Sequence, residues 1–198
     1  MDVDEFTDAL RDAHETPLSR LGSSKSLYAL TGGEMAGDAV RAAVAREAAL
    51  AAEAYADLAS ETSGEQATFE TLADRAAEQA ETAGAEPANR AFPDVEALGE
   101  PTTDAGRLGA AFARQLLADT RVGQAVGFFV GDADPAGADE FRSLREAVAA
   151  DRDRVADRLA TVDDRATARE AADAVIEAAY DDYVESLESM GVEPKNVC

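Results

Sequence analysis

Hydrophobic residues recur every three or four positions over four long stretches of the chain, and alternation with period two does not extend over any useful length. A repeat of three to four residues places apolar side chains along one face of an α-helix. The pattern therefore predicts helices at about residues 38–60, 65–83 and 103–130, and a fourth from Asp134-Pro135 to about residue 160. Aspartate followed by proline is typical of a helix start. The predicted fold class is all-α.

Shorter elements flank the four long helices. The spacing from Val3 to Leu21 predicts a short amphipathic helix that Pro17 breaks near its end, followed by a Gly- and Ser-rich linker with at most a short helix. A loop at residues 84–101 contains three prolines and is expected to cross the bundle. A last helix is predicted from about Asp164 to Met190, where a glycine stops it.

These elements divide the chain into three predicted parts. Residues 1–37 form an N-terminal helix and linker, residues 38–160 a four-helix bundle, and residues 161–198 a C-terminal helix and tail. The expected architecture is a four-helix bundle with additional N- and C-terminal helices.

Charge excludes several classes of partner. The chain has 41 acidic and 18 basic residues and a formal net charge of -23. Such an excess of carboxylates repels phosphate backbones and anionic lipid headgroups, so we expect neither direct nucleic-acid binding nor membrane binding. A hydrophobic fraction of 46% argues against disorder despite this charge.

The basic residues are unevenly chosen, because the only lysines are Lys25 and Lys195 and the other bases are arginines. An acidic, alanine-rich, lysine-poor chain is typical of a protein dissolved in molar salt, where a Debye length of about 3 Å screens its self-repulsion. We therefore expect a halophilic, archaeal-type composition. The alternative is that the acidity serves a cationic ligand.

Cysteine usage and the lack of a targeting segment indicate a cytoplasmic protein. The single cysteine, Cys198, is the last residue, so no internal disulfide is possible. No apolar run approaches the roughly 18 residues of a membrane span, and the acidic start MDVDEF does not resemble a signal peptide. Cys198 is a possible thiol site, as a redox thiol, a metal ligand or the origin of an intermolecular disulfide; the alternative is an exposed tail thiol.

Four polar residues interrupt the apolar faces of the long helices, one on each helix: Glu47, Gln79, Asp119 and Asp151. An unpaired carboxylate in a core is costly, so this repetition is unexpected in a plain structural bundle. One interpretation is that Glu47, Asp119 and Asp151 form a residual metal site of oxygen ligands. The other is that these acids reach solvent or pair with nearby arginines, for which the chain offers Arg46, Arg75, Arg114, Arg121 and Arg152.

The run AREAALAAEAYADLASETSGEQATFETLADRAAEQAETA resembles the first helical pair of the rubrerythrin and ferritin-like di-iron proteins. Those proteins bind two irons with a carboxylate from each of two helices and a Glu-x-x-His from each of the others. The resemblance implies a ferritin-like four-helix bundle. It matches this chain to the family pattern at Glu47, Tyr55, Phe69, Ala76, Gln79, Asp119, Val148 and Asp151.

Both histidines of that pattern, and the glutamates that accompany them, are absent. The only histidine is His14, outside the four-helix segment. The resemblance therefore implies a bundle with a degenerate di-iron site. No cofactor is expected, although iron or another divalent metal on Glu47, Asp119 and Asp151 is left open.

Three further segments, LSRLGSSKSLYALTGGEM, VGFFVGDADP and AAYDDYVESLESMGVEPKNVC, resemble uncharacterised haloarchaeal rubrerythrin-like proteins. The expected function is a non-enzymatic interaction or regulatory protein with a protein partner or self-association, such as a homodimer. One alternative is a metal-binding oxidoreductase or stress protein that uses the reduced carboxylate set. A further alternative is a transcription-associated, antitermination-like factor. No catalytic residues are assigned, because one histidine and one cysteine in the tail regions do not assemble a catalytic set.

Overall fold

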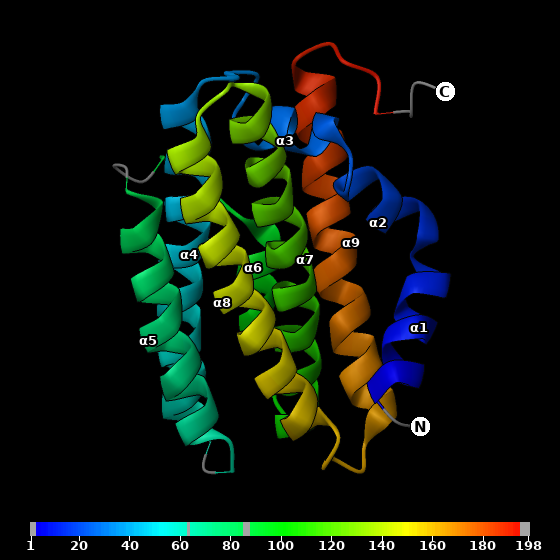
Figure 1. Cartoon of the computed structure of the whole chain (residues 1–198). Helices are drawn as coiled ribbons and strands as arrows, with labels where there is room; N and C mark the ends of the chain where they lie inside the picture. The colour runs from blue at the N-terminus through cyan, green and yellow to red at the C-terminus, as the bar shows by residue number, and fades with distance from the viewer. Residues whose placement is uncertain (1–2, 63, 85–87, 195–198) are drawn as a thin grey trace.

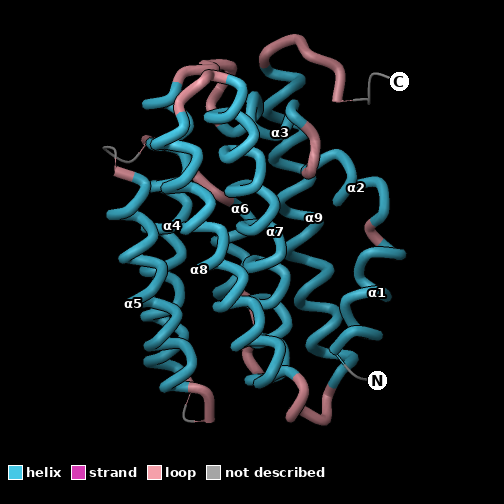
Figure 2. The backbone as a smooth tube through the Cα atoms, in the orientation of Figure 1, coloured by secondary structure: helices cyan, strands magenta, loops and turns pink. Residues whose placement is uncertain are grey.

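The computed structural model describes residues 3–62, 64–84 and 88–194. Helices and connecting loops account for all of these residues, with no strand among them (Figure 2), so the predicted all-α class is confirmed. None of the helices in these ranges has the length and apolar character needed to cross a bilayer. In chain order the elements are α1 (Val3–Ala13), α2 (Glu15–Leu21), α3 (Ser24–Leu30), α4 (Gly37–Glu61), α5 (Gln66–Ala83), α6 (Pro93–Glu96), the 3₁₀ turn η1 (Ala97–Gly99), α7 (Asp104–Gly131), α8 (Pro135–Leu159) and α9 (Arg165–Ser189).

Side-chain caps fix the starts of the three C-terminal helices. Thr103 Oγ1 accepts a hydrogen bond from Gly106 N at 3.1 Å. Asp134 Oδ1 accepts one from Gly137 N, and Asp164 Oδ1 one from Thr167 N, each at 3.0 Å. These oxygens bond to amide groups that have no partner within the first turn of a helix. The long helices α4 and α5 begin without a side-chain cap from a described residue, and the five helices α4, α5, α7, α8 and α9 all lie within two residues of their predicted ranges.

The predicted N-terminal helix is divided in two, and the break differs from the prediction. α1 ends at Ala13 and α2 begins at Glu15, so the chain turns at His14 and not at Pro17. Pro17 instead lies in the first turn of α2, where its missing N–H costs no helical hydrogen bond. The linker that follows contains one short helix, α3, as predicted.

The four long helices α4, α5, α8 and α7 contact one another in that cyclic order and surround a shared interior (Figure 1). α9 packs along α7 outside this group, and α1 to α3 lie against α9 and the neighbouring helices. α7 is therefore covered on several sides, and its first half is buried almost without interruption. α7 and α9 approach closely at Gly109, where a Cβ atom would lie only 1.9 Å from Ala168 O.

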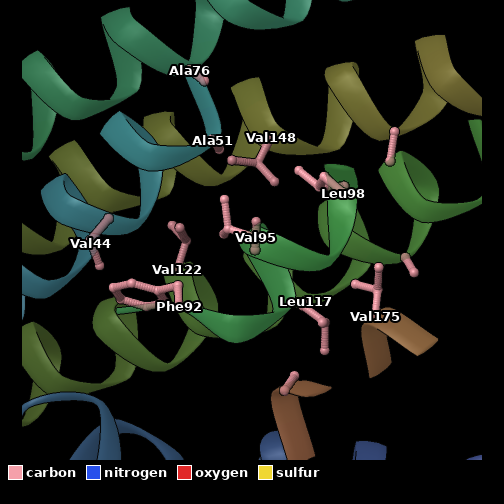
Figure 3. Close-up of a cluster of buried hydrophobic side chains, with 14 of the residues drawn as sticks. Val44, Ala51, Ala76, Phe92, Val95, Leu98, Leu117, Val122, Val148 and Val175 are labelled. Carbon is pink, nitrogen blue, oxygen red and sulfur yellow. The ribbon is translucent and has the colours of Figure 1, made fainter. Parts of the chain in front are cut away.

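The segment between α5 and α7 crosses the far side of the bundle, as predicted. We call its described part, residues 88–103, the crossing segment. It contains α6 and η1, and it contacts α4, α7 and α9. Phe92, Val95 and Leu98 are at most 2% exposed, in the same cluster as side chains of the long helices such as Val44 and Val122 (Figure 3). The crossing segment thus contributes to the core between the helices.

Candidate functional site

Four charged side chains are buried together between the helices. We call them the interior charge cluster: Glu47 on α4, Asp94 on α6, and Arg114 and Arg121 on α7, none of them more than 8% exposed. Arg114 Nε donates to Glu47 Oε1 at 3.0 Å, and Arg114 Nη2 lies 2.9 Å from the same oxygen. Arg121 Nη1 donates to Asp94 Oδ2 at 2.7 Å and lies 3.5 Å from Glu47 Oε1. Two carboxylates and two guanidinium groups thus neutralise one another, which makes their burial tolerable.

The electrostatics of the two arginines follow from this pairing. Burial is the largest single influence on the pKa of Arg114 and lowers it, but the combined attraction of Glu47, Tyr55 and Asp94 outweighs burial, so the pKa lies above its usual value. Burial likewise lowers the pKa of Arg121, and the hydrogen bond and charge of Asp94, together with the charges of Glu47 and Asp182, raise it above its usual value. Both guanidinium groups therefore stay charged, and neither can exchange a proton at neutral pH.

Tyr55 and Gln115 extend the cluster along the bundle. Gln115 Nε2 donates to Tyr55 Oη at 3.4 Å, and Arg114 Nη1 donates to Gln115 Oε1 at 3.3 Å. The Arg114 guanidinium also lies 5.8 Å from the centre of the Tyr55 ring. Burial raises the pKa of Tyr55 to about 12, because the phenolate would lose its hydration. The Tyr55 hydroxyl is consequently protonated at any physiological pH.

On the side of the crossing segment, Phe92 lies between two arginines. The guanidinium carbons of Arg90 and Arg121 lie 5.5 and 5.6 Å from the centre of its ring. Arg90 Nη2 donates to Asp182 Oδ2 on α9 at 2.5 Å, and Arg90 Nη1 donates to Ala29 O at the end of α3 at 3.1 Å. An ion pair to α9, a hydrogen bond to α3 and a cation–π contact with Arg121 on α7 therefore hold the crossing segment to three different helices.

Asp151 on α8 forms a second buried polar group with side chains of α5. Its carboxylate, 1% exposed as a side chain, accepts a hydrogen bond from Gln79 Nε2 at 2.8 Å and lies 3.2 Å from Arg75 Nη1. Burial raises the pKa of Asp151, and the attraction of Arg75 and the hydrogen bond from Gln79 only partly oppose this. Asp151 thus joins α8 to α5, at a point where the helix pair α4–α5 meets the helix pair α7–α8.

The prediction that Asp119 faces the shared interior is wrong. Its side chain is 17% exposed and binds Arg145 on α8, with Arg145 Nε to Oδ1 at 2.9 Å and Nη2 to Oδ2 at 3.3 Å. α7 is covered by α9 as well as by the bundle, so its buried face is too wide for a single stripe to mark the interior. A seven-residue spacing also drifts by about 20° around a straight helix.

Glu47, Asp119 and Asp151 therefore pair with different arginines, and no described group of three or more histidine, cysteine, aspartate or glutamate side chains is placed to hold a metal ion. Of the arginines predicted as partners, Arg75, Arg114 and Arg121 pair with these acids. Arg46 instead donates to Arg90 O, and Arg152 pairs with Asp153.

The residues present do not fit a di-iron centre. Such a centre needs free carboxylate oxygens together with imidazole ligands. Here guanidinium groups occupy the carboxylate of Glu47, and Gln79 and Arg75 contact that of Asp151. The single imidazole, His14, lies outside the bundle with its Nε2 2.7 Å from Asp173 Oδ1 on α9. The possible thiol site, Cys198, lies outside the described residues.

Sequence patterns missed several members of the buried polar groups. Asp94 and Arg90 belong to the crossing segment, where no helical repeat marks inward positions. Gln115 follows Arg114 directly, and both are buried because α7 is covered on several sides. The sequence contains one signal for the interior charge cluster: Arg114 and Arg121 are seven residues apart, which places them on the same face of α7.

Comparison with protein-family models, curated proteins and solved structures finds no match for this chain.

Proposed function

We propose that this chain is a rubrerythrin-related, ferritin-like helical bundle that has lost its di-iron site and acts non-enzymatically, as an interaction or regulatory protein. The observation that carries the proposal is the bonding of the fully buried Arg114 to Glu47. Seven of the eight positions matched by the resemblance, all except Asp119, are buried: Glu47, Tyr55, Phe69, Ala76, Gln79, Val148 and Asp151. Their placement supports a common ancestry of the bundle, while the arginine contacts oppose retention of the metal.

The chemistry of the interior also favours a structural role. A catalytic acid or base needs a pKa near the working pH and access to a substrate. The pKa values of Tyr55 and Arg114 are raised away from neutrality. Five surface hollows among the described residues are lined by none of the four residues of the interior charge cluster. A role carried by the surface is therefore the better explanation.

The experiment combines elemental analysis of the purified protein with a double-mutant cycle on Glu47 and Arg114. We expect substoichiometric iron, manganese and zinc. Glu47→Gln and Arg114→Met should each lower the free energy of unfolding by about 3–5 kcal/mol, because each leaves a buried charge without its partner. The double variant should cost less than the sum of the two, because the neighbours are coupled.

The alternative function, a metal-dependent oxidoreductase on the reduced carboxylate set, predicts a different result. A stoichiometric metal that Glu47→Gln removes would contradict the proposal. Asp153→Asn serves as the control in both measurements, since its exposed carboxylate pairs with Arg152 and belongs to no candidate ligand set. It should change neither the metal content nor, by much more than about 1 kcal/mol, the free energy of unfolding. Copurification with a polymerase would favour the transcription-associated alternative.

A further inference from the structure

A groove on the surface of α4 differs in its lining from four other hollows among the described residues. It has a volume of about 350 Å³ and lies between α4 and the crossing segment. Its lining consists of Leu50, Glu53, Ala54, Asp57, Leu58, Glu61, Val95, Glu96 and Gly99. No arginine or lysine lines it, whereas at least one arginine lines each of the four other hollows compared, all among the described residues.

The floor of the groove is apolar and regular. Leu50, Ala54 and Leu58 are spaced four residues apart and therefore form one row along α4. Leu58 is 1% exposed and Val95, on the opposite side, 2%, so both lie at the bottom, while Leu50 and Ala54 are half-buried. The row from Leu50 to Leu58 is about 12 Å long at 1.5 Å per residue. Two turns of a helix, or a short extended segment, match that length.

The rim of the groove carries carboxylates without partners. Glu53 and Asp57 on α4, and Glu96 on α6, are exposed and make no hydrogen bond or ion pair through their side chains with any described residue. Glu61, at the end of the same row, is paired with Arg107 Nη2 at 2.9 Å. An apolar floor with Glu53 and Asp57 on one side and Glu96 on the other is complementary to a segment with apolar side chains on one face and cationic side chains beside them.

We propose that this groove binds a cationic amphipathic segment of a partner protein, a proposal that rests on the interaction role proposed above and gives it a location and a partner chemistry. Apolar side chains of the partner pack on Leu50 and Ala54, and its lysine or arginine side chains pair with Glu53, Asp57 and Glu96. A second copy of this chain is a poor occupant, because its arginines are largely engaged within their own molecule, as at Arg107, Arg114 and Arg121.

High salt does not abolish such recognition. At about 1 M salt the Debye length is roughly 3 Å, so the diffuse field of the -23 charge is screened and only ion pairs in direct contact persist. Burial of apolar surface persists at that salt concentration, because it does not depend on charge. Binding should therefore weaken with salt at first and then level off.

The test measures fluorescence anisotropy of a labelled synthetic peptide, an amphipathic helix with leucines on one face and lysines beside them, titrated with the full chain. A second peptide carries glutamate in place of every lysine. The groove variant is Glu53→Gln, Asp57→Asn, Glu96→Gln. Its matched control, Glu177→Gln, Asp181→Asn, Glu185→Gln, makes the same change of charge on exposed residues of α9 that line none of the five hollows.

We expect the groove variant to bind the cationic peptide about tenfold more weakly and the control variant within about twofold of the native chain, since exposed ion pairs contribute up to about 1 kcal/mol each. Ala54→Arg, which fills the groove with a guanidinium, should abolish binding and leave the melting temperature nearly unchanged. Equal losses in the groove and control variants, or equal binding of the glutamate peptide, would overturn the proposal. So would sedimentation analysis that shows a homodimer disrupted only in the groove variant. None of these outcomes affects metal content, which tests the non-enzymatic role separately.

Discussion

Asp151 illustrates how one buried carboxylate couples stability to pH. Loss of hydration raises its pKa above the ordinary value of 3.8, against the opposing effects of Arg75 and Gln79. A carboxyl whose folded pKa is raised binds its proton more tightly in the folded state than in the unfolded state. Its stabilising contribution is therefore complete below pH 3.8 and is lost as pH rises through the folded pKa.

We expect Asp151→Asn to remove this pH dependence. The free energy of unfolding of the variant, relative to that of the native chain, should be lowest near pH 4 and highest near pH 7. The change should be about 1.4 kcal/mol for each unit by which the folded pKa exceeds the unfolded pKa. Urea unfolding at a series of pH values measures the difference. A difference that stays constant from pH 4 to 7 would show that Asp151 does not titrate as described.

Glu65 provides a control of opposite sign. The hydrogen bond from Arg158 lowers the pKa of Glu65, aided by Thr68 and opposed by burial. Its contribution is therefore present above pH 4.5 and is lost as pH falls through the folded pKa. Glu65→Gln should accordingly lower the free energy of unfolding most near neutral pH and least in acid.

For single residues, the sequence identified polar side chains on the long helices but did not predict for all of them whether they point into the interior. Glu47, Gln79 and Asp151 break apolar stripes on helices with one covered face, so their inward position was predictable. Asp119 lies on a helix covered on several sides, where the stripe does not single out the interior. Asp94 has no periodic neighbours, so only the fold could place it beside Arg121.

Among the elements, α7 depends on one glycine, Gly109, for its close approach to α9. Gly109 allows the backbone of α9 to approach so closely that a Cβ atom would lie 1.9 Å from Ala168 O. Gly127 lies further along the same helix, and a Cβ atom there would have no neighbour within 4 Å. The two glycines are thus in the same element but meet different surroundings.

We expect Gly109→Ala to lower the free energy of unfolding by at least about 2 kcal/mol, because α9 would have to move away from α7. Gly127→Ala should raise it by about 0.5–1 kcal/mol, because alanine is the better helix former. Chemical denaturation of both variants compares the two effects. A tolerated alanine at residue 109 would contradict the close packing of α7 and α9.

Helix positions were predictable because periodicity and caps agree. Asp134 and Asp164 mark helix starts in both the sequence and the structure. The break at His14 was not predictable, because α1 and α2 belong to one continuous apolar pattern. In the structure His14 Nε2 lies 2.7 Å from Asp173 Oδ1 on α9, a residue far away in the sequence. Contacts between helices that are distant in the sequence decide such breaks, and the hydrophobic pattern of a single segment carries no information about those contacts.

For the whole molecule, the distribution of charge separates interior from surface. The interior charge cluster contains two carboxylates and two guanidinium groups, so it adds nothing to the net charge of -23. The excess negative charge must therefore lie outside this cluster. Repulsion among surface carboxylates disfavours the compact state and is screened by salt, whereas buried pairs are screened much less.

We therefore expect the free energy of unfolding to rise between 0.1 and 2 M KCl, concentrations that correspond to Debye lengths from about 10 Å to below about 3 Å. Neutralising Glu177, Asp181 and Glu185 on α9 should reduce this dependence, because it removes part of the repulsion that the salt screens. The stability difference caused by Glu47→Gln should stay nearly constant over the same range, because the Glu47–Arg114 pair is buried. Urea denaturation at each KCl concentration gives all three quantities. A native chain whose stability does not change with KCl would show that its surface repulsion is too weak to require salt, and would remove the basis for a halophilic interpretation of its acidity.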